Sequence, residues 1–111
     1  MRNMSFMLTT AQIRAKTKTV TRRIGWRFLK AGEQIQACVK CQGLKPGEKI
    51  QRLCVLEVVS VRREPLESIS QQDVRAEGFP HLTPAEFIEM FCSAMGCRPE
   101  SEVTRIQFVY V

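Results

Sequence analysis

The pattern of apolar and polar positions divides the chain into a strand-rich first part, a helical part and a last strand. Five segments have the apolar, aromatic or β-branched residues that are typical of strands: residues 5–8, 18–22, 34–40, 50–63 and 103–111. The fourth of them is apolar at both sets of alternating positions around Leu53 to Val61. This predicts that both faces of its middle are covered.

The last strand has a simple alternation. Ile106, Phe108 and Tyr110 fall on one face and Arg105 and Gln107 on the other, because successive side chains of a strand point to opposite faces. We expect the face with the three aromatic or aliphatic residues to pack on the core.

Two short helices are predicted from their end signals. Thr9, followed three residues later by Gln12, is typical of a helix start, and this helix should end near Ala15. A second short helix opens at residues 70–73 and ends around residues 77–78.

A third helix has the clearest signals in the chain. Thr83 is placed as its cap, Pro84 as its first residue and Glu86 three residues after the cap. Gly96 should end it. One face carries an apolar stripe made of Phe87, Ile88, Phe91, Cys92 and Met95.

The order of these elements predicts the fold class. Strands joined by turns, with the helices grouped rather than alternating with strands, favour an α+β fold built on a small sheet or barrel. A length of 111 residues corresponds to one domain, so we expect residues 1–111 to form a single unit.

The composition is that of an ordinary globular protein. The hydrophobic fraction is 44% and the charged fraction 25%, which excludes a disordered, collagen-like or coiled-coil chain. Apolar runs are only a few residues long, so no membrane span is expected, and residues 1–6 lack the apolar core of a secretory signal. We therefore expect a cytoplasmic protein.

The charge is distributed unevenly. The formal net charge is +6, but residues 1–63 carry 14 Lys or Arg and three Glu, whereas residues 64–111 carry three Arg and eight acids. A strongly basic segment attracts phosphate, which points to nucleic acid, although folding can also offset its charge with the acidic half. Aromatic residues Trp26 and Phe28 interleave with the cations, so this region is suited either to stacking on bases or to core packing.

Several chemistries are not supported by the residues. The five cysteines include one C-x-x-C, Cys38 to Cys41, but no second closely spaced pair that a four-thiolate zinc site requires. His81 is the only histidine and lies in a predicted turn, so a catalytic triad is not expected. No phosphate-binding loop or dinucleotide fingerprint is present. We expect no metal and no cofactor.

Residues 17–23 stand out as a dense array of hydrogen-bond donors, with three Thr, one Lys and two Arg in seven positions. A solvated edge strand would account for this composition as well as a binding site would. Lys18 and Thr21 are three residues apart, so an ideal strand would point them to opposite faces. They can converge only if the segment is bulged, looped or helical there.

At this segment the chain resembles the ASCH superfamily, whose domains have a fold related to the PUA domain of RNA-modifying proteins. The resemblance rests on Lys18-Thr19-Val20-Thr21-Arg22-Arg23, on the Gly32-Glu33 turn, on Glu77-Gly78-Phe79 and on the final strand. It implies a small PUA-like β-barrel with short flanking helices. One position departs from the pattern: family members often have Gly two residues before the Lys, and this chain has Lys16.

The resemblance also implies a function. Some ASCH proteins resemble amidohydrolases that remove the acetyl group of N4-acetylcytidine through a Lys, a Thr and a Glu, which fall here on Lys18, Thr21 and Glu77. Thr21 would be the nucleophile, neutral Lys18 its base, and Glu77 would orient a water or protonate the leaving amine. Further residues are expected to bind the substrate or nucleic acid, with Trp26 near the mouth of the pocket: Arg22, Arg23, Trp26, Arg27 and Lys30.

Two other functions are compatible with the same resemblance. One is an RNA-binding module without chemistry, which grips RNA with four cations: Arg22, Arg23, Arg27 and Lys30. The other is an ASCH-type ribonuclease, in which Lys18 and Arg23 would stabilise a pentavalent phosphate, although a histidine base is missing from the motif. The expected partner is accordingly a modified nucleoside or RNA.

Overall fold

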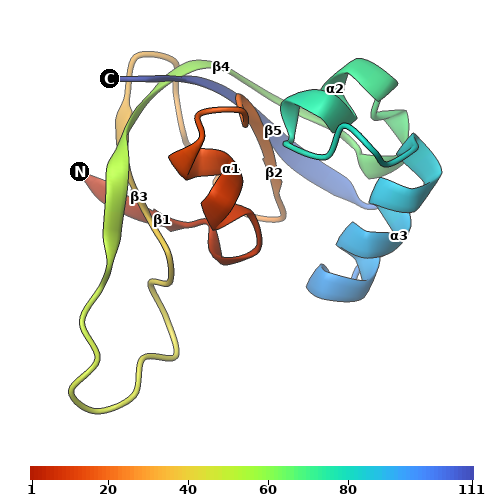
Figure 1. Ribbon diagram of the computed structural model, residues 1–111. Coiled ribbons are helices and arrows are strands. Elements are labelled where there is room, and N and C mark those ends of the chain that lie inside the picture. Colours follow the sequence, from red (N-terminus) through yellow and green to blue (C-terminus); the bar gives the residue numbers. More distant parts are fainter.

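The computed structural model describes residues 1–111 and contains five strands, three α-helices and two short 3-10 helices (Figure 1). In chain order the elements are β1 (Arg2–Ser5), η1 (Met7–Thr9), α1 (Thr10–Arg14), β2 (Val20–Arg23), β3 (Gln34–Cys38), β4 (Arg52–Pro65), η2 (Leu66–Ser68), α2 (Gln71–Ala76), α3 (Pro84–Met95) and β5 (Glu102–Tyr110). The helices α2 and α3 are grouped between β4 and β5, as an α+β arrangement requires.

The five strands form one curled sheet in the order β1-β3-β4-β5-β2. β1 pairs with β3 in parallel, and every other pairing is antiparallel. The edge strands β1 and β2 are not hydrogen-bonded to each other, so the sheet is an open half-barrel. The sheet therefore has the curvature expected of a barrel but is not closed, and the segment 6–19 between these two strands forms η1, α1 and a loop.

The long strand β4 forms the middle of the sheet, and its two faces differ. Leu56 and Val58 are buried, whereas Val59 is 44% exposed. The register to β5 shifts between Val58 and Ser60, where a bulge places an extra residue in β4. The prediction that both faces are covered is wrong, because Val59 lies on the face opposite Leu56 and Val58, and no helix packs there.

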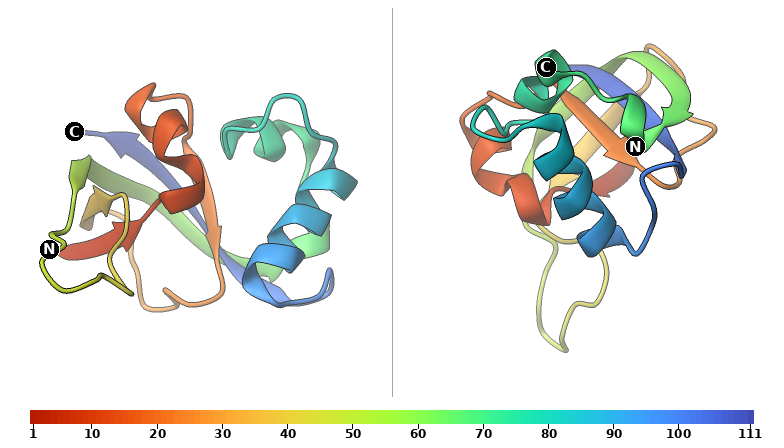
Figure 2. Two further views of the ribbon diagram at one scale, coloured as in Figure 1. Left: turned by 60° about the horizontal axis from the view of Figure 1, so that its bottom comes forward. Right: turned by 90° about the vertical axis from the view of Figure 1, so that its right-hand side faces the viewer.

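The apolar side chains gather in two separate clusters. The larger fills the concave side of the sheet and includes Phe6, Ile13, Leu56 and Phe108. The smaller joins η2, α2 and α3 to the start of β5, with Phe87 and Val103 among its members. Figure 1 and the left view of Figure 2 show α1 against the curled sheet and the α2–α3 pair beyond β2. The larger cluster therefore lies on the α1 side of β2, and the smaller cluster lies on the side of α2 and α3.

The end signals of the helices are confirmed for α3 and only in part for α1. The Thr83 hydroxyl accepts from the Glu86 N–H, the Glu86 carboxylate accepts from the Thr83 N–H, and Gly96 ends the helix with φ of 65°. Thr9 precedes α1 but its side chain makes no capping bond. Gln12 donates instead to the Gly78 carbonyl, which ties α1 to the end of α2. None of the helices has the length and apolar character needed to cross a bilayer.

Candidate functional site

The segment before β2 is a loop, and this brings Lys18 and Thr21 to the same side. Lys16 adopts φ of 60°, and the N–H groups of Thr17 and Lys18 both donate to the Gln12 carbonyl. The strand begins only at Val20. Lys16 is the position at which the chain departs from the pattern of the resemblance, and Gly adopts this left-handed conformation with less strain than Lys.

Glu77 is placed by the end of α2. It is the C-cap residue, and its N–H donates to the Asp73 carbonyl at 2.8 Å. The following Gly78 has φ of 99°, and an added Cβ would lie 2.7 Å from Cγ of Gln12. Thr19 donates its N–H to the Ala76 carbonyl at 2.8 Å. α1, β2 and the end of α2 are thereby held together at the point where Glu77 emerges.

Gly78→Ala is expected to destabilise the fold by about 1–3 kcal/mol, because the methyl group meets Gln12 in a backbone conformation that disfavours any side chain. Gly47→Ala is the matched control: its φ is also positive, at 85°, but no atom lies within 4 Å of an added Cβ. Urea unfolding of both variants measures the difference. Equal losses of unfolding free energy in the two variants would show that the contact with Gln12 does not contribute to the destabilisation.

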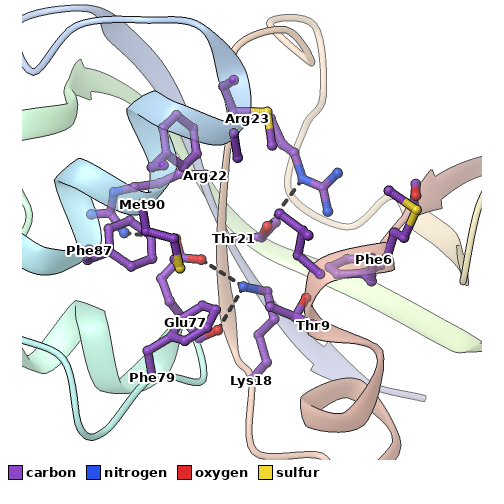
Figure 3. Close-up of a pocket in the computed structure, with 16 residues that line it drawn as sticks. Phe6, Thr9, Lys18, Thr21, Arg22, Arg23, Glu77, Phe79, Phe87 and Met90 are labelled. Atoms are coloured by element: carbon purple, nitrogen blue, oxygen red, sulfur yellow. Dashed lines mark hydrogen bonds and ion pairs between the residues drawn. The ribbon is translucent and has the colours of Figure 1, made fainter.

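A cavity of about 500 Å³ opens between the two apolar clusters (Figure 3). Lys18, Thr21 and Glu77 line it, although they come from a loop, a strand and a helix end. Each is at most 3% exposed. The remaining wall residues are mostly apolar and come from the segment 5–9, from β2, from Phe79 and from α3: Ser5, Phe6, Met7, Leu8, Thr9, Arg22, Arg23, Phe79, Phe87, Met90, Phe91, Ala94 and Met95.

Lys18 and Glu77 form a buried pair. The Lys18 Nζ donates to Glu77 Oε1 at 2.7 Å and to the Glu77 backbone carbonyl at 2.8 Å. Burial lowers the pKa of Lys18, the Glu77 carboxylate opposes this, and Arg23 and Arg22 add to the lowering. A neutral amine has two N–H donors and one lone pair. Glu77 Oε1 and the Glu77 backbone carbonyl accept from both donors of this form. The lone pair of the amine then has no partner in the protein.

Thr21 is paired with the second arginine of the motif. Arg23 Nε donates to Thr21 Oγ1 at 3.2 Å, and the Arg23 guanidinium lies 4.6 Å from the centre of the Phe6 ring. Burial lowers the pKa of Arg23 to about 10. Its Nη atoms make no hydrogen bond to the protein and no ion pair. Arg23 therefore offers free cationic donors beside the Thr21 hydroxyl.

Arg22 has a different environment from Arg23. Its side chain is fully buried, and its guanidinium contacts three carboxylates: Glu77 Oε2 at 3.2 Å, Asp73 Oδ2 at 2.6 Å and Glu64 Oε2 at 3.2 Å. Contacts with Arg105 and then with Arg22 hold the pKa of Asp73 down at about 2. Arg22 was expected to bind substrate, but these contacts occupy its Nη atoms and make it a positioning residue for Glu77.

The other sequence-predicted binding residues lie outside the cavity. Trp26 was expected near the mouth, but it belongs to the β2–β3 connection, where Arg2 stacks 5.1 Å from its ring centre. Trp26 and Arg27 line a separate shallow depression, and Lys30 is exposed nearby in the chain. His81 is also exposed. The five cysteines are free thiols, and no group of His, Cys, Asp or Glu is arranged to hold a metal ion.

The apolar stripe predicted on the third helix turns out to form part of the cavity wall. From the sequence we interpreted this stripe only as a face that packs on the core. Phe87, Phe91 and Met95 belong to the predicted apolar stripe and line the cavity together with Met90 and Ala94. Their spacing of three and four residues places all five on one helix face. Because Met95 is 46% exposed, this face extends from the core to the mouth of the cavity.

Comparison with known proteins bears on the fold. No family model matches the chain, and no curated protein sequence matches it. Solved structures do match: the ASCH domain from Lactobacillus crispatus JV V101 superposes with a TM-score of 0.69 at 15% identity, covering 98% of this chain and 78% of that one. This chain has the fold of an ASCH domain.

Two further structures share the ASCH fold of this chain. Protein EF3133 from Enterococcus faecalis V583, described as family DUF984, has a TM-score of 0.64 at 17% identity and covers 94% of this chain and 70% of its own. The hypothetical protein PH0355 has a TM-score of 0.66 at 14% identity, with coverages of 99% and 96%. At such identities the similarity establishes the fold, and the chemistry has to be argued from the cavity.

Proposed function

We propose that this ASCH domain is an amidohydrolase that removes the acyl group from an N4-acylated cytidine or a related modified nucleoside. The observation that carries the proposal is that a buried amine, a hydroxyl and a carboxylate line one cavity. Amide hydrolysis needs a nucleophile, a proton acceptor, a proton donor and a group that stabilises the oxyanion. The cavity offers one candidate for each role.

Thr21 is the nucleophile in this proposal. Its Oγ1 attacks the acyl carbon while neutral Lys18 takes the hydroxyl proton, and the free Nη donors of Arg23 bind the oxyanion. The C–N bond then breaks, and the exocyclic amine leaves with the proton that Lys18 took from Thr21, which the Glu77 carboxylate passes on to it. Water hydrolyses the Thr21 ester, which releases the carboxylic acid and restores the hydroxyl. Lys18 is neutral and Glu77 is a carboxylate at the start and at the end of the cycle, and their 2.7 Å hydrogen bond is the path of the proton between them.

The charges around the site favour a neutral Lys18. The carboxylates of Glu64, Asp73 and Glu77 are already met by guanidinium groups, chiefly those of Arg22 and Arg105. A charged Lys18 therefore adds a positive charge to a buried region that also contains Arg23. In a low-dielectric interior this excess is costly, which agrees with the lowered pKa of Lys18.

The size and lining of the cavity suit a nucleobase. A volume of about 500 Å³ lies within the usual range for small-molecule sites. Phe6, Phe79, Phe87 and Phe91 supply aromatic surface for a planar ring, and Arg23 supplies a polar contact beside the reacting hydroxyl. An amide attached to a nucleobase has a planar aromatic ring for the phenylalanines and a polar carbonyl for Arg23.

The proposal is tested by incubating the purified protein with N4-acetylcytidine. Chromatography then measures the cytidine and acetate that are formed. Thr21→Val, which keeps the shape but removes the hydroxyl, is expected to reduce kcat by about 10³-fold or more. Thr9→Val is the matched control, because Thr9 is another buried threonine of the same wall, and it should keep kcat within about tenfold. Equal turnover by the Thr21 variant and wild type would exclude Thr21 as the nucleophile.

A second candidate function is RNA binding without chemistry. It is favoured by the exposed cations and aromatic residues outside the cavity, among them Arg27, Lys30 and Phe28, which is 85% exposed. A protein of this kind would bind RNA with a strong salt dependence and leave N4-acetylcytidine intact. The turnover assay therefore separates the two candidates.

A further inference from the structure

A basic arm projects from the domain between β3 and β4. Residues 39–51, which we call the arm, form neither helix nor strand and extend away from the sheet and from α2 and α3 (Figures 1 and 2). Its base is closed by a hydrogen bond from the Val39 N–H to the Gln51 carbonyl at 2.9 Å. The arm projects beyond the sheet as a long loop in both figures.

The cations of the arm have no acidic partner. Lys40, Lys45 and Lys49 belong to it and Arg52 follows directly, and none of the four forms an ion pair. The only acid of the arm, Glu48, accepts a hydrogen bond from the Lys45 backbone N–H at 2.6 Å. Its carboxylate therefore stabilises the turn at residues 45–48 and does not pair with a lysine side chain. The arm therefore carries a positive charge that the rest of the chain leaves uncompensated.

The base of the arm lies beside the cavity. Ser5 Oγ donates to the Val39 carbonyl at 3.1 Å and the Phe6 N–H donates to the Cys38 carbonyl at 2.8 Å, and both Ser5 and Phe6 line the cavity. The arm thus begins at the wall of the cavity that holds Thr21.

We propose that the arm binds the phosphates of single-stranded RNA so that the base of one nucleotide lies in the cavity. The inference rests on the proposed amide hydrolysis for the identity of that base, and it makes the substrate class an acylated cytidine within RNA. A free nucleoside has no phosphate and gains nothing from these lysines. Single strands are favoured over duplex because a base must leave its stack to enter a buried cavity, and an unpaired base does so at the lowest cost.

The test compares two triple variants of the full chain. Lys40→Gln/Lys45→Gln/Lys49→Gln removes three charges from the arm. The matched control removes three exposed cations elsewhere: Arg14→Gln/Arg75→Gln/Arg98→Gln. Anisotropy of a labelled 12-nucleotide single-stranded RNA is measured over a series of salt concentrations. Hydrolysis is measured with N4-acetylcytidine as the free nucleoside and within the same RNA.

The arm variant should bind RNA about 100-fold more weakly than wild type at 0.1 M salt, and the slope of log affinity against log salt should fall by about 2, since each lost contact contributes about 0.7. The value of kcat/KM for the acetylated RNA should fall to a similar extent, whereas turnover of the free nucleoside should not change. The control variant should bind RNA within about threefold of wild type.

Equal RNA affinity of the two triple variants would overturn the proposal while leaving hydrolysis of the nucleoside intact. So would arm-dependent binding to phosphatidylserine vesicles without arm-dependent binding to RNA. Absence of hydrolysis of both substrates, together with arm-dependent RNA binding, would contradict the amidohydrolase function and retain the arm as an RNA-binding element. An RNA turnover rate that does not respond to the arm variant would show that the arm does not guide the base into the cavity.

Discussion

Replacement of Lys18 by Met is expected to reduce amide hydrolysis by about 10²–10⁴-fold, because it removes the base that takes the Thr21 proton and leaves the other wall residues in place. Methionine has a similar length and suits an apolar interior, and Arg22 still contacts Glu77 Oε2 at 3.2 Å. The variant should therefore fold. The loss should be in kcat rather than in KM, since Lys18 acts on the proton and not on the bound base.

The pH dependence gives an independent readout of the same role. Because the reactive form of Lys18 is the neutral amine and burial lowers its pKa, kcat/KM should rise with pH through that lowered pKa and reach a plateau below the ordinary value of 10.5. Lys18→Arg serves as the charge-preserving control: it keeps a cation beside Glu77 but does not deprotonate, so it should be inactive at every pH. An Arg variant with wild-type turnover would contradict the role of Lys18 as a base.

Asp73→Asn is expected to lower the free energy of unfolding by about 3–5 kcal/mol, because it removes the charged partner that the buried Arg22 and Arg105 share. Asp73 Oδ2 accepts from Arg22 at 2.6 Å and from Arg105 at 2.7 Å, and the Arg22 side chain has no solvent-exposed surface. Thermal and urea unfolding measure the loss. Glu89→Gln is the control, since Glu89 is exposed and unpaired, and it should change stability by less than about 0.5 kcal/mol.

The acid sensitivity of the wild type should follow from the same carboxylate. Hydrogen bonds from Arg105 and Arg22 hold the pKa of Asp73 at about 2 in the folded protein, below the ordinary value of 3.8. The stability that this provides is fully present above pH 4 and is lost as the pH falls toward 2. The Asp73→Asn variant should lose less stability than wild type over this interval. Identical acid transitions in both proteins would show that Asp73 does not contribute to the pH dependence.

The sequence predicted most of the local elements, and the resemblance supplied three of the residues that line the cavity. Capping residues and glycines marked α3, and the alternation of Ile106, Phe108 and Tyr110 marked the buried face of β5. The resemblance to ASCH proteins identified Lys18, Thr21 and Glu77, which spacing alone did not bring together. Their convergence depends on the left-handed turn at Lys16, for which a non-glycine residue gives no sign.

What the sequence did not reveal depends on contacts between distant segments. Arg22 and Arg23 are neighbours in a basic motif and were given the same role, but Arg22 meets Glu64 and Asp73, which lie 42 and 51 residues away. Only the folded chain shows that these carboxylates occupy one arginine and leave the other free. The bulge at Val59 is likewise a property of the pairing between β4 and β5, and the β4 sequence alone does not specify it.

The most direct test of the account is to look for the acyl group on Thr21 during turnover. The wild-type protein is mixed in excess with N4-acetylcytidine, quenched with acid at successive times and analysed by peptide mass spectrometry, with Thr21→Val in parallel. We predict one acetyl group on the peptide that contains Thr21, appearing together with cytidine and absent from the Val variant. Release of cytidine while Thr21 stays unmodified at every time point would contradict the proposed chemistry.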